Sequence, residues 1–117
     1  MAHGEVHYLR LTGDPVKAKS FYYAMFNWKF GVPIQIGGKT YYPWDDGEGP
    51  GGDAVLPSAG EAVDWLPFVE VADLDESINH ALGLGATVLV PATKWIDNQR
   101  YAILKDPCGA RIGIWEP

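Results

Sequence analysis

In the first half of the chain, apolar and polar residues alternate in short segments, and in one segment the apolar residues recur at helical spacing. Residues 3–12 alternate between apolar and polar side chains, which is typical of a strand. Asp14 and Pro15 then mark a helix start, because aspartate caps the first turn and proline fits its first position. The apolar side chains that follow recur at helical spacing and predict one apolar face, packed on a sheet. They are Ala18, Phe21, Tyr22 and Met25.

The next segments predict a β-hairpin followed by a loop. Residues 28–36 and 39–44 are rich in apolar and β-branched or aromatic residues, and Gly37-Gly38 between them is a hairpin signal. Residues 45–53 contain four glycines and a proline, so we expect a loop there. A short strand over 54–56 and a linker over 57–62 complete this half.

The second half repeats the same order of elements. A strand over 64–72 is followed by Asp73 and Glu76, a pair that resembles a capping box. The helix after them has an apolar face and ends at Gly85. Its apolar face consists of Leu74, Ile78, Ala81 and Leu82. Strands over 87–91, 100–105 and 110–115 follow, with a turn at Asp106-Pro107-Cys108-Gly109 between the last two.

The repeat predicts one α+β domain made of paired βαβββ modules. Module one covers about 3–56, the linker 57–62 and module two about 63–117. Neither module buries both faces of its sheet alone, so we expect the two to pair. The helices then lie outside, and the inner faces of a curved mixed sheet form a cup.

Composition excludes several classes of function. Hydrophobic residues make up 47% of the 117 residues, with 5 Trp, 6 Tyr and 4 Phe, so a core forms without disulfides. The single cysteine, Cys108, favours a reducing compartment, and we predict the cytoplasm. A net charge of −6 argues against nucleic acid as a partner. No apolar run approaches the roughly 20 residues of a membrane helix.

Three motifs resemble the vicinal-oxygen-chelate superfamily, which includes glyoxalases and bleomycin-resistance proteins. Residues 14–22 with 26–30 resemble its D-P-x-x-A-x-x-F-Y-x-x-x-F-G-W-x-F pattern, with Asn27 where glycine is usual. Residues 106–117 resemble its D-P-x-G-x-x-x-G-L-W ending, and 69–74 the start of a second module. The resemblance implies the cup-shaped fold and often a dimer. Many members hold a divalent metal for isomerisation, epimerisation, ring cleavage or thiol addition to epoxides; others sequester a drug without metal.

The metal ligands that the resemblance implies are mostly missing. Relatives take them from the first and last strands of each module, and His7 matches the first position. Leu66 and Gly113 fall on two others and have no donor atoms, while Asp53 falls near the fourth. We therefore predict no complete metal site and no cofactor, with a divalent metal as the alternative. His7 is then either a remaining ligand or a packing residue that faces the first helix with Leu9 and Leu11.

Strand alternation predicts which side chains line the cup. In the last strand, Ile112 and Ile114 suit the helix side, as Val69 and Val71 do in the first strand of module two. Their neighbours then face inward. Among these, Glu70 and Arg111 either pair with each other or bind a polar ligand. Aromatic residues near the cup suit a planar or cationic molecule. The predicted ligand-binding residues are Tyr42, Trp44, Phe68, Glu70, Trp95, Tyr101, Arg111 and Trp115.

Three functions agree with these patterns. The first is an aromatic-lined protein that binds a small organic molecule, aromatic or cationic, without a complete metal site. The second is a metal-dependent glyoxalase-like lyase or isomerase, and the third is a protein-interaction module. We also expect a homodimer, and no membrane partner. The sequence leaves the catalytic residues and the question of an enzymatic activity open.

Overall fold

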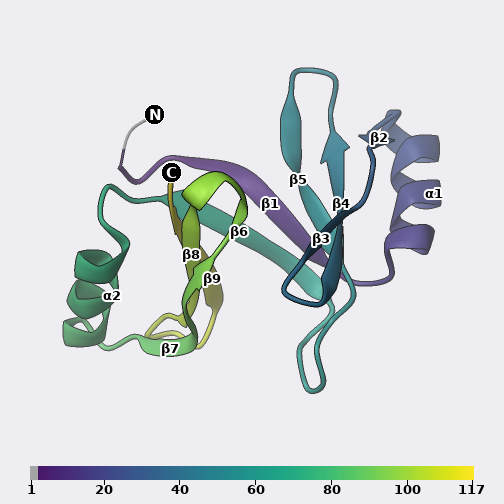
Figure 1. The fold of residues 1–117 in the computed structure, drawn as a ribbon. Helices are drawn as coiled ribbons and strands as arrows, with labels where there is room; N and C mark the ends of the chain where they lie inside the picture. Colours follow the sequence, from purple (N-terminus) through teal and green to yellow (C-terminus); the bar gives the residue numbers. More distant parts are fainter. Residues whose placement is uncertain (1–2) are drawn as a thin grey trace. The chain divides into compact units, whose positions relative to one another are not determined.

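The computed structural model describes residues 3–117 and divides the chain into two compact units. Unit 1 consists of Met1–His7 and Pro67–Pro117, and unit 2 consists of Tyr8–Leu66. Each unit contains one helix and several strands (Figure 1). The elements follow the order of two βαβββ modules, so the predicted α+β fold class is confirmed. The predicted boundaries of the modules and of the linker stay predictions.

Unit 2 has a mixed sheet in which β5 pairs with β1 in parallel and with β4 antiparallel. Both β2 and β3 pair with β4, because the strand expected over 28–36 is broken at Gly31-Val32-Pro33. Proline lacks the amide hydrogen that a continuous ladder needs. The elements are β1 (Val6–Thr12, from Tyr8 onward in this unit), α1 (Pro15–Phe26), β2 (Lys29–Phe30), β3 (Ile34–Ile36), β4 (Lys39–Asp45) and β5 (Pro50–Val55).

The prediction of a loop over 45–53 is wrong in its second half, where β5 begins at Pro50. The glycines there serve close contact rather than a turn. A Cβ atom on Gly51 would lie 2.1 Å from the Trp44 ring, and one on Gly52 would lie 1.6 Å from the Leu9 carbonyl oxygen. Glycine is therefore required at both positions so that β5 can pack beneath the indole and beside β1.

The predicted apolar face of α1 is only partly correct. Ala18 is buried and Tyr22 is half-buried, but Phe21 and Met25 are 56% and 57% exposed. Apolar residues occur on several sides of this helix, since Tyr23 is exposed as well. One narrow stripe of the helix packs on its unit, and the remaining apolar side chains face solvent.

Unit 1 has a sheet in the order β6–β9–β8–β7, with β6 and β9 parallel and the other pairs antiparallel. The last predicted strands are confirmed, although β7 runs on to Lys94 and β6 ends at Glu70. The elements are β6 (Asp64–Glu70, from Pro67 onward in this unit), α2 (Leu74–Gly83), β7 (Thr87–Lys94), a short 3-10 turn (Ile96–Asn98), β8 (Arg100–Lys105) and β9 (Arg111–Glu116).

Helix α2 covers one face of this sheet. Leu74 is fully buried there, and Ile78 and Ala81 pack against the same cluster, as predicted. Leu82, expected on the same face, is 48% exposed. The cluster contains the four residues predicted for the helix side, Val69, Val71, Ile112 and Ile114, so that prediction is confirmed. It also contains Ala102 and Leu104 of β8, for which no side was predicted.

The predicted caps and turns are present. Asp14 accepts hydrogen bonds from the amides of Val16 and Lys17, and Pro15 opens α1. Asp73 accepts from the amide of Glu76 at 3.0 Å. Asn27, where relatives have glycine, caps α1 with a φ of 60°. Asparagine tolerates this left-handed conformation better than most residues, so it replaces glycine at a helix end.

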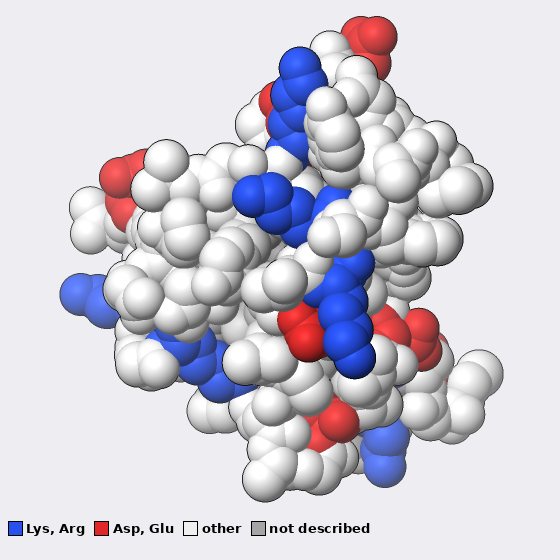
Figure 2. Space-filling view, turned by 90° about the vertical axis from the view of Figure 1, so that its right-hand side faces the viewer, with Lys and Arg blue, Asp and Glu red and all other residues white. Residues whose placement is uncertain are grey.

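No helix within residues 3–117 is long and apolar enough to cross a membrane. Acidic and basic side chains both occur on the face shown in Figure 2, and most of that face is uncharged. The many exposed apolar side chains of unit 2 agree with this picture. The predicted cytoplasmic location stays a prediction.

Candidate functional site

The strand register of unit 1 places three predicted site residues in one row. Glu70 on β6 is the partner of Trp115 on β9, which is the partner of Tyr101 on β8. Partners in adjacent strands point to the same face of a sheet, and here that face is opposite α2. The row thus brings a carboxylate, an indole and a phenol side by side.

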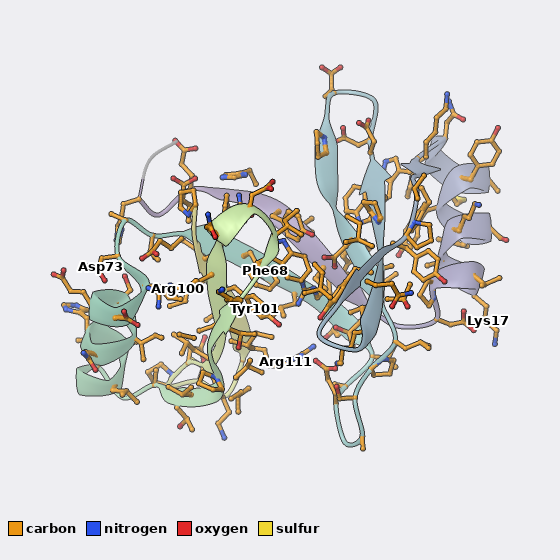
Figure 3. The ribbon with its side chains drawn as sticks, viewed as in Figure 1. Lys17, Phe68, Asp73, Arg100, Tyr101 and Arg111 are labelled. Atoms are coloured by element: carbon orange, nitrogen blue, oxygen red, sulfur yellow. The ribbon has the colours of Figure 1, made fainter. Side chains whose placement is uncertain are left out.

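Further aromatic rings extend this row. Phe68 meets Tyr101 edge to face with ring centroids 5.9 Å apart, and the two lie close together in Figure 3. Trp95, in the loop after β7, meets Tyr101 edge to face with ring centroids 5.5 Å apart. Such contacts hold the rings in fixed orientations. We call this surface the aromatic face. It consists of His7, Phe68, Glu70, Trp95, Tyr101 and Trp115.

The loop that carries Trp95 has an unusual backbone. Asp97 and Asn98 have φ angles of 53° and 63°, in the left-handed region that residues with a Cβ rarely adopt. The amide of Trp95 donates to the carbonyl of Gln99 at 2.8 Å and closes the loop. Consecutive residues in this conformation persist when the surroundings hold them. The loop therefore fixes the backbone position of Trp95, whose ring lies next to Tyr101.

His7 belongs to the aromatic face, and its interpretation as a residue packed toward the first helix is wrong. Its Nε2 atom lies 3.2 Å from Oε1 of Glu70, and its ring meets Trp115 edge to face at 5.6 Å. The side chain of Glu70 is only 6% exposed, against 32% for His7. A buried carboxylate needs a hydrogen-bond partner, and His7 supplies one.

Trp115 contributes a polar group without a partner. Its indole Nε1 is buried and donates to no acceptor within the part of the chain that the structure describes. Leaving a buried donor unpaired costs about 1–3 kcal/mol, so native proteins usually satisfy it with water or a ligand. Trp115 is therefore the point on the aromatic face where an external acceptor gains most.

The residue opposite Phe68 has a steric role. Gly113 is the register partner of Phe68, and a Cβ atom at this glycine would lie 2.4 Å from the phenyl ring. The ring thus fills the space above Gly113 where a longer side chain would project. Arg111, two residues earlier on β9, is half-buried on the same face and also belongs to unit 1.

Two predicted site residues lie in unit 2. Trp44 is 4% exposed and stacks on Trp28 with ring centroids 4.3 Å apart, while its Nε1 donates to the backbone carbonyl of Asp53. Tyr42 is half-buried on the same side of β4. Trp44 is therefore part of the aromatic core of unit 2. The predicted role of Tyr42 and Trp44 in ligand binding stays a prediction.

A buried charge network in unit 2 was not predicted. Arg10 and Asp53 are register partners on β1 and β5, and the guanidinium donates from Nε at 2.9 Å and from NH2 at 3.2 Å. The Tyr8 hydroxyl donates to the same carboxylate, and the guanidinium lies 4.8 Å from the centre of the Tyr41 ring. The sequence did contain a signal for this network. Arg10 shares one strand face with Tyr8 and Thr12, and a charged residue on a buried strand face needs a partner.

This network sets two protonation states. Burial and then the Asp53 carboxylate raise the pKa of the Tyr8 hydroxyl well above its usual value, so it stays a hydrogen-bond donor. Burial acts to lower the pKa of the Arg10 guanidinium, but Asp53, with smaller help from Tyr8 and Tyr41, raises it overall. The Arg10 guanidinium therefore stays charged and the Tyr8 hydroxyl stays protonated at neutral pH.

The described residues do not fit the divalent metal that the resemblance implies. Leu66 is fully buried and apolar, and the Phe68 ring covers Gly113. Asp53 is held by a guanidinium, and His7 by Glu70. Among residues 3–117, no three His, Cys, Asp or Glu side chains gather where one ion could bind them all. A divalent ion requires several such donors together.

The buried pair in unit 2 gives a test of stability. Asp53→Asn keeps the size of the side chain but removes the charge that faces Arg10, so we expect the free energy of unfolding to fall by about 3 kcal/mol. The double variant Arg10→Met with Asp53→Asn removes both charges and should recover part of this loss. Urea unfolding measures both. If the loss of unfolding free energy in the double variant equalled the sum of the losses in Asp53→Asn and Arg10→Met, the assignment of a stabilising buried ion pair would be contradicted.

Comparisons with known proteins follow the sequence motifs. No family model matches the chain. The chain is 30% identical over 110 residues to CFP32 of Mycobacterium bovis and of Mycobacterium tuberculosis, whose name marks it as a suspected glyoxylase. These 110 residues cover 90% of this chain and 42% of the relative. The chain thus spans about two fifths of the length of the curated relatives that it matches.

Solved structures show the same fold at low sequence identity. A methylmalonyl-CoA epimerase of Streptomyces coelicolor in complex with 2-nitronate-propionyl-CoA has a TM-score of 0.71 at 17% identity, covering 98% of this chain and 95% of that one. A hypothetical protein of Bacillus halodurans has a TM-score of 0.74 at 14% identity, covering 97% and 94%. Together with the sequence relatives, they show that the chain has the glyoxalase-like fold of the vicinal-oxygen-chelate superfamily, as its sequence motifs suggested.

Proposed function

We propose that this chain binds a small, flat organic molecule on the aromatic face of unit 1 and does so without a divalent metal. The observation that supports it is a series of four neighbouring aromatic side chains, one of which lies beside a buried carboxylate. Phe68, Tyr101 and Trp95 contact one another in series, and Trp115 lies beside Tyr101 and Glu70. Aromatic walls with a few fixed polar groups are typical of sites for small organic molecules.

The relatives support a small-molecule site in general terms. Two of the similar epimerase structures are complexes with CoA esters, which are organic molecules of moderate size. In place of the metal chelation that the sequence resemblance implies, the aromatic face offers stacking and hydrogen bonding. Phe68 over Gly113 supports this, because the ring stands where a ligand-donating side chain would need room.

The alternative is a metal-dependent glyoxalase-like lyase or isomerase. The names of the relatives favour it, since they describe a glyoxylase and epimerases. The two functions differ in one requirement, a complete set of metal ligands. That set would have to include His7, Asp53 or Glu70, and each of these three side chains already has a charged or imidazole partner.

Binding on the aromatic face gives the first test. Titration with quinoline, followed by tryptophan fluorescence, should show saturable quenching. Replacing Tyr101 with Ala removes the central ring and should weaken binding about tenfold, the equivalent of one lost aromatic contact. The control Tyr23→Ala removes an exposed ring from α1 and should leave affinity unchanged. Equal affinity of both variants and the parent protein would contradict the proposed site.

Metal analysis separates the two functions. Protein purified from medium supplemented with nickel, zinc, manganese and iron should contain far less than one metal ion per chain, because the described donors do not form a set. Quinoline affinity should not change after treatment with a chelator. About one tightly held ion per chain, lost together with ligand binding, would favour the metal-dependent enzyme instead.

We further propose that the protein is a homodimer, as the resemblance to its superfamily implies. Large apolar side chains of α1 are more than half exposed, among them Phe21, Met25 and Phe26. Patches of this kind mark contacts between proteins. Light scattering should give twice the mass of one chain, and Phe21→Ser with Met25→Ser should shift the equilibrium toward a single chain. A monomer at micromolar concentration would count against a homodimer.

A further inference from the structure

The aromatic face holds one donor and one acceptor next to each other. The donor is the buried Nε1 of Trp115, which has no acceptor among the described residues. The acceptor is the buried carboxylate of Glu70, whose residue is the register partner of Trp115. His7 contacts both side chains, at 3.2 Å from the carboxylate and 5.6 Å from the indole ring. The three groups therefore form one small polar patch among aromatic rings.

His7 acts on this patch as a positioning residue. Its Nε2 occupies one oxygen of Glu70, Oε1, and so limits the orientations that the carboxylate adopts. Its ring edge rests on the Trp115 side chain and helps hold the indole plane. A ligand that enters beside these rings meets an oriented acceptor and an oriented donor rather than two freely rotating groups.

This pattern selects among ligand classes. A cationic amine would pair with Glu70 but would leave the Trp115 N–H without an acceptor. A carboxylate would accept from Trp115 but would lie against the negative charge of Glu70, which is unfavourable in a buried site. A neutral group that carries an N–H next to a C=O satisfies both side chains at once.

We propose that the aromatic face recognises a neutral, planar lactam, that is, a cyclic amide fused to or part of a flat ring. The lactam N–H donates to Glu70, its carbonyl accepts from Nε1 of Trp115, and its ring lies against Tyr101 and Phe68. This inference rests on the proposed function, and it narrows the ligand from aromatic or cationic compounds to neutral heterocycles with adjacent donor and acceptor.

Three probes of nearly the same shape test it by calorimetric titration. Carbostyril is a benzo-fused lactam, N-methylcarbostyril lacks its N–H, and quinoline lacks both the N–H and the carbonyl. Carbostyril should bind about tenfold more tightly than either of the other two, because each hydrogen bond in the pair contributes about 0.5–1.5 kcal/mol.

Variants assign the preference to the named groups. Trp115→Phe keeps an aromatic ring but removes the N–H, so carbostyril affinity should fall about tenfold. Circular dichroism and urea unfolding show whether the variant is folded. Trp65→Phe makes the same chemical change in unit 2 and should leave carbostyril affinity unchanged. His7→Phe keeps a flat ring beside Trp115 and should reduce the preference for carbostyril over N-methylcarbostyril.

The outcomes separate the two levels of the proposal. Equal affinity of the three probes overturns the lactam inference. A carbostyril affinity that Trp115→Phe leaves unchanged overturns it as well, because the indole N–H would then not bind the carbonyl. In both cases quinoline binding would still support the aromatic face. Failure of all three probes to bind overturns both the inference and the proposed function.

Discussion

The parallel register of β6 against β9 is the constraint on which the chemistry of unit 1 depends. It sets Val69 against Ile114, on the side of the α2 core, and Glu70 against Trp115 on the opposite side. Side chains alternate with a period of two, so a slip by one residue would bury Glu70 beneath α2 and expose Val69. The close approach of Phe68 to Gly113 opposes such a slip, because only glycine leaves room for that ring. One steric contact therefore fixes which residues meet a ligand.

The two units treat a buried carboxylate differently. In unit 2, Asp53 is 1% exposed and is held by the guanidinium of Arg10 and the hydroxyl of Tyr8. A guanidinium carries a permanent charge and donates twice, so this carboxylate is neutralised within the protein. In unit 1, Glu70 has His7 as its partner, which occupies one oxygen. The first arrangement is closed and structural, whereas the second leaves bonding capacity for another molecule.

Much of the fold could be predicted because its signals are local. A single residue type at a single position predicts the helix caps at Asp14 and Asp73 and the turn at Asp106. The alternation of apolar and polar residues in β9 predicts correctly which side chains face α2. The glycines at 51 and 52 were misinterpreted, because glycine occurs both in turns and at close contacts. Here the ring of Trp44 lies against Gly51 and the backbone of Leu9 lies against Gly52, and both contacts come from other strands. The partners of His7 and Arg10 lie 63 and 43 residues away in the chain, so no local pattern reveals them.

The loss of metal donors changes what such a fold can discriminate. A divalent ion binds any ligand that offers two oxygens at the right spacing, so selectivity in a chelating site comes mainly from the rest of the pocket. Without an ion, each polar contact must match a donor to an acceptor, and an unmatched buried group is penalised. Glu70 accepts and Trp115 donates, so the site distinguishes ligands by the order of donor and acceptor groups along their edge. Rings such as Tyr101 add affinity but tolerate many flat molecules, and for that reason the polar pair carries the specificity.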